Sequence, residues 1–115
     1  MPEYKLVIEG GRELRGETFV SGGKNTSLAV VPATLLAEGP CLIENLPDIE
    51  DIRVLTQILR HLGAGVDWRS QQNQMLVEPN KVTGDTVPFR LSQRMRASYY
   101  LMGALLGRYG YARVG

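Results

Sequence analysis

The sequence predicts an α/β domain in which strands and helices follow one another in a repeated order. From Leu14 onward, the apolar patterns give strand, helix, strand, helix, strand and strand, after which a second helix-then-strand unit begins. The last predicted strand, Tyr111 to Val114, is apolar and runs almost to Gly115. Because a chain more naturally closes with a cap or a polar tail, we expect about one and a half units of a repeat architecture.

Composition narrows the class of protein. The 115 residues are 43% hydrophobic and 22% charged, which is typical of one globular domain. Thirteen basic against twelve acidic side chains provide no basic face for nucleic acid. One cysteine and one histidine exclude an internal disulfide and argue against a structural zinc site. No apolar run is long enough to cross a bilayer and Met1 to Lys5 lacks a signal peptide's apolar segment, so we expect a cytoplasmic protein.

The first third of the chain predicts two strands and a buried helix. Tyr4 to Glu9 and Leu14 to Val20 have strand-like patterns separated by glycines. Leu28 to Ala37 is apolar on almost every side, which is typical of a helix buried all round. Since proline disrupts a helix interior, either the regular helix starts near Val31 or it is kinked at Pro32.

The middle of the chain predicts a strand and the best-defined helix. Cys41 to Asn45 gives the strand, and Asp48 is a suitable N-cap for the helix that follows. Glu50 and Asp51 place negative charge at the positive end of the helix dipole, and Gly63 follows the last turn. The apolar stripe of this helix consists of Ile49, Ile52, Leu55, Leu59 and Leu62.

The last part of the sequence predicts a hairpin, a third helix and a final strand. Gly65 to Arg69 and Gln74 to Glu78 are short strands joined by the polar turn 70–73. The third helix is expected from about Ser92 to Arg108. Its glycines Gly103 and Gly107 lie four residues apart and indicate close helix packing.

The stretch Ser21 to Asn25 is a candidate anion site at the turn before the first helix. Gly22 and Gly23 can adopt positive φ and allow a ligand close to the backbone, while Lys24 supplies a compact charge and Asn25 a donor and an acceptor. The spacing is neither a Walker loop nor a dinucleotide fingerprint. On spacing alone, a turn with an exposed lysine and an asparagine cap explains the stretch better than a ligand site.

Four stretches of the sequence, in order, resemble a known family. They are Ser21–Asn25, Ala33–Pro40, Asn45–Asp51 and Met95–Ser98, with Gly103 further on. Together they resemble the N-terminal part of the UDP-N-acetylglucosamine enolpyruvyl transferase (1-carboxyvinyltransferase) family, over essentially all 115 residues. The related shikimate-pathway enzymes typically have Gly-Ser-Lys-Ser and a nearby arginine at this turn. Lys24-Asn25 without that arginine therefore fits the sugar-nucleotide branch better.

The resemblance implies an inside-out α/β barrel built of strand-helix-strand-helix-strand-strand repeats with the helices inside. It implies that residues 1–23 belong to the second domain of the whole enzyme and residues 24–115 to the first, with Lys24 at the hinge. The implied reaction is transfer of enolpyruvate from phosphoenolpyruvate to the 3-hydroxyl of UDP-N-acetylglucosamine, the first committed step of peptidoglycan synthesis. The family requires no metal or organic cofactor.

The resemblance also implies roles for individual residues. Lys24 matches the lysine that contacts phosphoenolpyruvate and is the candidate catalytic residue, Asn25 matches the asparagine that orients substrate, and Arg96 matches an arginine of the sugar-nucleotide site. The reactive cysteine of the family lies beyond Gly115, and Cys41 is expected to be an inert core side chain. Because that cysteine and the second domain are missing, we expect the 115 residues alone to bind substrate poorly and to be inactive.

Simpler roles remain open for several side chains. Arg96 could pair with a neighbouring carboxylate and Tyr100 could be a core residue. The helix dipole sufficiently explains Asp51, and Arg94 has no motif support. Two alternatives to the sugar-nucleotide enzyme also remain: a shikimate-pathway enolpyruvyl transferase, and a non-catalytic folding or oligomerisation module that self-associates through uncovered apolar faces.

Overall fold

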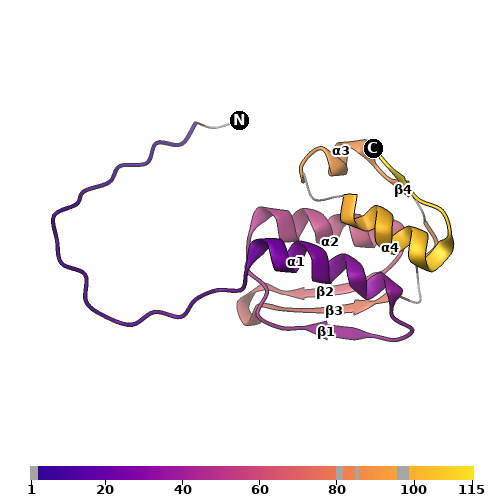
Figure 1. The fold of residues 1–115 in the computed structure, drawn as a ribbon, viewed down its shortest axis with the longest axis horizontal. Helices are drawn as coiled ribbons and strands as arrows, with labels where there is room; N and C mark the ends of the chain where they lie inside the picture. Colours follow the sequence, from indigo (N-terminus) through magenta and orange to yellow (C-terminus); the bar gives the residue numbers. More distant parts are fainter. Residues whose placement is uncertain (1–2, 80–81, 85, 96–98) are drawn as a thin grey trace.

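The computed structural model describes residues 3–79, 82–84, 86–95 and 99–115. Its centre is a three-stranded antiparallel sheet in the order β1 (Cys41–Ile43), β3 (Gln74–Glu78) and β2 (Gly65–Arg69). Helices α1 (Lys24–Ala33) and α2 (Glu50–Leu62) lie on one face of this sheet, and α4 (Tyr100–Tyr109) packs beside α1 (Figure 1). The α/β class predicted from the sequence is confirmed.

The register of the sheet explains which side chains enter the core. Met75 of β3 lies between Ile43 and Trp68 of the neighbouring strands, and Val77 occupies the equivalent central place two residues later. Both central side chains are fully buried because alternate residues of a strand face the same side. The predicted hairpin is confirmed, and Asn73 closes its turn with a left-handed backbone (φ 55°).

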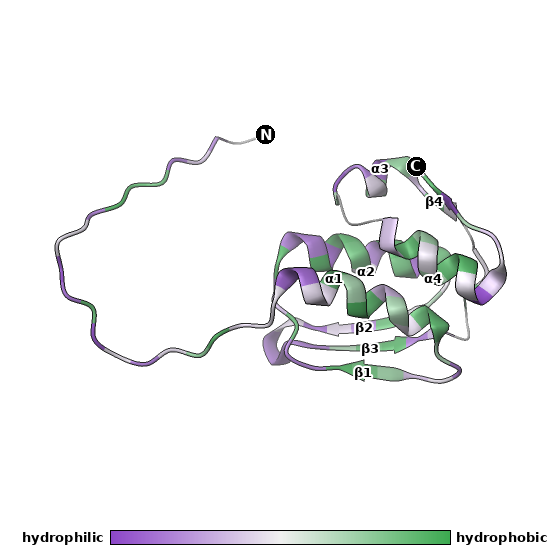
Figure 2. Cartoon of the chain, viewed as in Figure 1, coloured by the Kyte–Doolittle hydropathy of each residue, from purple (hydrophilic) through white to green (hydrophobic). Residues whose placement is uncertain are grey.

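Helix α1 differs from its prediction in position and in burial. It begins at Lys24 and continues as a short 3₁₀ helix, η1 (Thr34–Leu36), so Pro32 lies near its end and not in its first turn. The polar residues 24–27 carry no apolar period, which is why the pattern did not place them in a helix (Figure 2). Only one face is buried, and Val30 and Leu36 remain about half exposed on the other.

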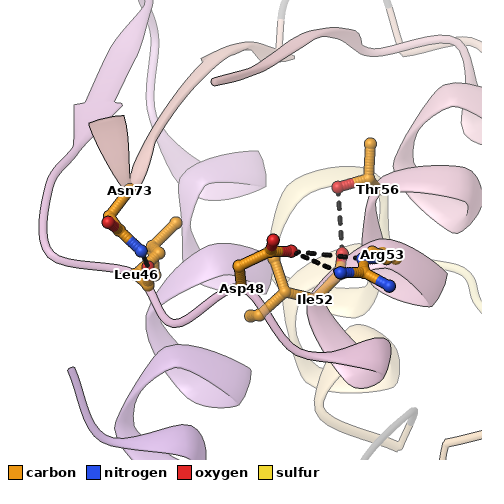
Figure 3. A network of polar contacts seen from close by, with 6 residues as sticks. All are labelled: Leu46, Asp48, Ile52, Arg53, Thr56 and Asn73. Atoms are coloured by element: carbon orange, nitrogen blue, oxygen red, sulfur yellow. Dashed lines mark hydrogen bonds and ion pairs between the residues drawn. The ribbon is translucent and has the colours of Figure 1, made fainter. Parts of the chain in front are cut away.

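Helix α2 confirms most of its prediction. Its predicted stripe is buried apart from the partly exposed Ile49, and Gly63 ends it with φ 101°. The predicted N-cap is wrong: Ile49 occupies that position, and no side chain caps the helix. The carboxylate of Asp48 instead accepts hydrogen bonds from Arg53 at 3.0 and 3.1 Å (Figure 3), because it turns along the helix and not toward its first amides.

The predicted helix from Ser92 to Arg108 is not continuous. The chain forms a short helix α3 (Phe89–Ser92), leaves helical structure at residues 93–95, and re-enters it at α4. An apolar period does not reveal such an interruption, since both pieces bury one side. Within α4, a side chain at Gly107 would lie 3.0 Å from Leu36, whereas Gly103 faces open space, so close packing is confirmed only at Gly107.

The final predicted strand is present in shorter form. Strand β5 (Arg113–Val114) pairs in parallel with β4 (Thr86–Val87), away from the main sheet. The hydroxyl of Ser92 donates to the carbonyl of Gly115 at 2.7 Å and links this pair to α3.

Residues 3–22 form neither of the two predicted strands. They run as an extended arm away from the helices and the sheet (Figure 1), and side chains such as Phe19 are fully exposed. A strand needs a partner for its backbone hydrogen bonds, and no described segment pairs with this arm. The assignment of residues 1–23 and 24–115 to two domains therefore stays a prediction.

Candidate functional site

Lys24 and Asn25 occupy the first turn of α1. Gly23 is the N-cap residue, and its carbonyl accepts from both the amide (3.1 Å) and the hydroxyl (2.6 Å) of Ser27. Asn25 therefore does not cap the helix and is exposed beside Lys24. The first amides of a helix have no carbonyl partner within it and favour negative charge nearby. The turn thus combines a lysine, an amide side chain and the positive end of a helix.

The glycines before Lys24 serve the protein's own backbone. Neither Gly22 nor Gly23 has positive φ, contrary to the expected use of that freedom. A side chain at Gly22 would place its Cβ only 1.7 Å from the carbonyl oxygen of Asn45. Because no Cβ atom fits at that distance, glycine is required here to seat the start of α1 against the loop that precedes α2.

Asn73 fixes the loop that leads into α2. Its carbonyl accepts from the Leu46 amide at 2.9 Å, and its side-chain amide donates to the Leu46 carbonyl at 2.7 Å (Figure 3). Asn45, one residue earlier, has a left-handed backbone (φ 59°). The turn between β2 and β3 thereby holds the segment from which α2 begins, and so helps to place the first turn of α2 beside α1.

This arrangement brings Asp51 against Lys24. The Lys24 Nζ lies 3.1 Å from Asp51 Oδ2, with 59% of the lysine side chain exposed but only 21% of the aspartate. A lysine near the positive end of its own helix is electrostatically unfavourable, and the carboxylate offsets that charge. Asp51 thus pairs with the candidate catalytic residue, a contact that the helix-dipole interpretation missed.

Around this pair the structure forms a cavity of about 540 Å³. It is open to solvent on one side and lies between the first turns of α1 and α2 and the start of α4. The residues lining it are Lys24, Asn25, Leu28, Asp51, Arg94, Tyr99 and Tyr100. Cys41 lies elsewhere, half-buried on β1 with its thiol 3.7 Å from the Gly39 carbonyl, and is less buried than predicted.

Arg94 is the second cation of the cavity. Its guanidinium pairs with the carboxylate of Glu50 and lies 3.4 Å from the side-chain oxygen of Gln57, both on α2. No sequence motif selected Arg94, because its partners lie about forty residues away and only folding brings them together. Among the described residues, the two cations that line the cavity are each paired with a carboxylate at the start of α2.

Two adjacent tyrosines complete the cavity. The ring centroids of Tyr99 and Tyr100 lie 4.7 Å apart with planes inclined by 36°. The hydrogen bond to Tyr100, followed by electrostatic repulsion from it, raises the pKa of Tyr99 above its usual value. Tyr99 is therefore neutral at physiological pH. Tyr100 is partly exposed at the cavity and does not have the core position that was considered as an alternative.

Arg96, the third predicted site residue, lies outside the described residues. Arg94 and Tyr99, two residues before it and three residues after it in the sequence, line the cavity. Within the described part of the chain, no cluster of histidine, cysteine and carboxylate side chains could hold a metal ion, and no helix is long and apolar enough to span a membrane. Cation-assisted binding of an anion is the chemistry that the described side chains support.

Comparison with known proteins decides the family. The sequence profile of EPSP synthase (3-phosphoshikimate 1-carboxyvinyltransferase) matches residues 8–114, nearly the whole chain. The chain belongs to the EPSP synthase family of carboxyvinyltransferases. The resemblance inferred from the four sequence stretches is thus confirmed at the level of the family.

Comparison with individual relatives shows which members of the family this chain resembles. It is 45% identical over 108 residues to UDP-N-acetylglucosamine 1-carboxyvinyltransferase 3 of Caldanaerobacter subterraneus, covering 94% of this chain and 25% of the relative. It is 41% identical over 111 residues to UDP-N-acetylglucosamine 1-carboxyvinyltransferase 2 of Bacillus subtilis, covering 96% of this chain and 25% of the relative.

A solved structure of an enolpyruvyl transferase has a similar fold. The enolpyruvyl transferase NikO from Streptomyces tendae superposes with a TM-score of 0.79 at 34% identity, over 90% of this chain and 24% of that protein. This family member therefore spans about a quarter of the length of the relatives that it matches.

Proposed function

We propose that this chain supplies the Lys24 side of the active site of a UDP-N-acetylglucosamine 1-carboxyvinyltransferase. The observation that carries the proposal is the cavity in which Lys24, Asn25 and Arg94 meet at the first turns of two helices. A partly enclosed site with cationic and amide side chains can offset the charges of a phosphate and a carboxylate on one small substrate. Phosphoenolpyruvate carries both groups.

In the proposed reaction, the sugar 3-hydroxyl of UDP-N-acetylglucosamine adds to C2 of phosphoenolpyruvate while C3 gains a proton. The resulting tetrahedral intermediate then loses phosphate from C2 and a proton from C3, which restores the C2–C3 double bond in the enolpyruvyl group now attached to the sugar oxygen. Lys24 stabilises the phosphate and carboxylate charge, and the amide of Asn25 orients the substrate. Arg96 is proposed to bind the sugar nucleotide.

The larger architecture belongs to the same proposal. The helices cover only one face of the sheet, as expected of one segment of an inside-out α/β barrel whose helices face inward (Figure 1). In that arrangement residues 1–23 contribute to a second domain and Lys24 lies at the hinge. We propose that turnover requires sequence beyond these 115 residues, including a reactive cysteine, and that the whole enzyme acts in peptidoglycan synthesis in the cytoplasm without a cofactor.

Binding measurements on matched variants test this function. Nuclear magnetic resonance titration with phosphoenolpyruvate should shift the amides of Lys24 and Asn25, and Lys24→Gln should weaken this binding by about tenfold or more because a charge-assisted hydrogen bond is lost. Lys5→Gln, in the extended arm, is the matched control and should leave binding unchanged. Unchanged affinity in Lys24→Gln would contradict the proposed role.

The choice of acceptor needs a separate measurement. The named relatives favour UDP-N-acetylglucosamine, whereas the family profile is named for 3-phosphoshikimate transfer. Titration with UDP-N-acetylglucosamine and with shikimate 3-phosphate in the presence of phosphoenolpyruvate distinguishes the two. Tighter binding of shikimate 3-phosphate would move the assignment to the shikimate branch.

A second candidate function is a folding or oligomerisation module. Its support is the apolar surface on α1, η1 and α4, where Val30, Leu36 and Leu106 are each exposed by more than 40%. Sedimentation over a range of protein concentrations tests this candidate. Stable self-association that Leu36→Ser abolishes, together with no phosphoenolpyruvate binding, would favour the module over the enzyme.

A further inference from the structure

We propose that Arg94 is a further phosphate-binding residue of this site and that Glu50 competes with the ligand for it. The inference rests on the proposed function, because it assumes that a phosphate-bearing substrate enters the cavity beside Lys24. What it adds is a residue that the family resemblance did not select and a charge exchange that accompanies binding. The proposal predicts that the ion pair between Arg94 and Glu50 opens when the ligand binds.

The first step concerns where the guanidinium lies. Arg94 lines the same cavity as Lys24 and Asn25, although these residues come from segments about seventy positions apart in the chain. Glu50, its partner, is not among the residues that line the cavity. Glu50, which lies outside the cavity, therefore holds Arg94 at the edge of the site. If this ion pair opened, the planar guanidinium of Arg94 could bind a phosphate through two hydrogen bonds.

The second step concerns how firmly Arg94 is held. The side chains of Arg94 and Glu50 are 46% and 60% exposed, and the other described contact of the guanidinium is the exposed side-chain oxygen of Gln57. Ion pairs with this exposure favour the paired state by no more than about fivefold. A doubly charged phosphate in a partly enclosed cavity offers Arg94 a stronger partner than one solvated carboxylate.

The third step concerns the charge left in the cavity. Lys24 is already paired with Asp51, which is the more buried member of that pair. A ligand phosphate that approaches Lys24 therefore meets a carboxylate as well, and one lysine does not neutralise both. Movement of Arg94 from Glu50 toward the ligand supplies the missing positive charge, while Glu50 remains hydrated at the surface.

The structure provides a matched control pair at the same end of α2. Asp48 and Arg53 form an ion pair at 3.0 Å with side-chain exposures of 39% and 54%, yet neither residue lines the cavity (Figure 3). Neutralising Asp48 changes the net charge near the start of α2 as neutralising Glu50 does. Asp48→Asn therefore separates a general change in electrostatic potential from the release of Arg94.

The experiment measures dissociation constants by nuclear magnetic resonance titration of the full chain, with phosphoenolpyruvate in one series and UDP-N-acetylglucosamine in the other. We expect Arg94→Gln to weaken one of these ligands about tenfold and Glu50→Gln to tighten the same ligand by up to about fivefold. In the double variant, the tightening by Glu50→Gln should disappear. Asp48→Asn and Arg53→Gln should change neither constant by more than about 1.5-fold.

The Nε–Hε resonance of Arg94 gives an independent readout, since it should shift on binding in the wild type and already be displaced in Glu50→Gln. The ligand series that responds to Arg94→Gln identifies which substrate supplies the phosphate. Tightening that persists in the double variant, or equal tightening in Asp48→Asn, would overturn the exchange. Loss of binding in Lys24→Gln without any effect of Arg94→Gln would refute this inference and leave the proposed function standing, whereas no binding by the wild type would refute both.

Discussion

Asn73 is the residue whose replacement best tests how the site is assembled. It lies in the turn between β2 and β3, far in sequence from Lys24, and two of its groups hold the loop before α2. Replacement by alanine removes the hydrogen bond from its side-chain amide to the Leu46 carbonyl, which costs about 1 kcal/mol. It also places an alanine at φ 55°, a conformation that costs most residues roughly 1–2 kcal/mol but that asparagine tolerates because its short polar side chain can hydrogen-bond locally.

The sum predicts that Asn73→Ala lowers the free energy of unfolding by about 2.5 kcal/mol. Asn73→Gly loses the same hydrogen bond but adopts the left-handed backbone freely, with only about 0.5 kcal/mol lost to the flexibility of the unfolded chain, so it should cost about 1.5 kcal/mol. For a domain of this size, these values correspond to melting temperatures lower by about 12 °C and about 7 °C.

Thermal unfolding followed by circular dichroism measures both variants, and Gln71→Ala, an exposed substitution in the same turn, is the control. Equal destabilisation by alanine and glycine would refute the backbone contribution. A melting temperature unchanged in both variants would refute the role of Asn73 as an anchor of the loop. Because that loop precedes α2, Asn73→Ala should also shift the amide resonance of Asp51, and an unshifted resonance would separate loop stability from site geometry.

Three further predictions address the start of α1, the core and the tyrosine pair. Gly22→Ala should cost about 2 kcal/mol and shift the Asn45 amide, because its methyl group would overlap the Asn45 carbonyl; an unaltered spectrum would contradict this. Leu55→Ala should cost about 3 kcal/mol in urea unfolding, since Leu55 is fully buried, and a loss below about 1 kcal/mol would show a poorly packed core. The pKa of Tyr99, raised by Tyr100, should fall toward its usual value in Tyr100→Phe when followed by ultraviolet titration.

The sign of the tyrosine effect follows from the direction of the shift. The pKa of Tyr99 is raised in the folded protein relative to its usual value, so folding favours the protonated phenol. The associated stability is fully present below the ordinary tyrosine pKa and is lost as the pH rises through the raised value. Through this group the free energy of unfolding is therefore expected not to vary with pH near neutrality. A pH dependence near pH 7 that Tyr100→Phe abolishes would contradict the assignment.

The sequence was sufficient to predict those helices, strands and motifs that depend on short stretches of the chain. Helix α2 followed from its apolar period and from Gly63, and the hairpin followed from two short apolar runs around a polar turn. Lys24 and Asn25 were selected because their motif occurs together with three other family motifs in the expected order. The residue spacing within their own motif would not have selected them. These features depend on residues within a few positions of one another or on patterns shared by a family.

Other features depended on contacts that local sequence does not encode. The interruption before α4 and the burial of only one face of α1 were set by which segments meet in space. The two predicted N-terminal strands were wrong for the same reason, because a strand pattern indicates suitability for pairing but does not supply the partner.

The candidate site shows most clearly which features the sequence predicts and which depend on tertiary structure. The sequence by itself identified Lys24 as a lysine at a glycine turn before the first helix and, through family resemblance, as a substrate contact. Only the tertiary structure paired Asp51 with Lys24 and brought Arg94 into the same cavity, since contacts between distant segments depend on the positions of whole helices. Charge is a property of each residue, but the potential that a ligand meets depends on how the fold arranges those charges.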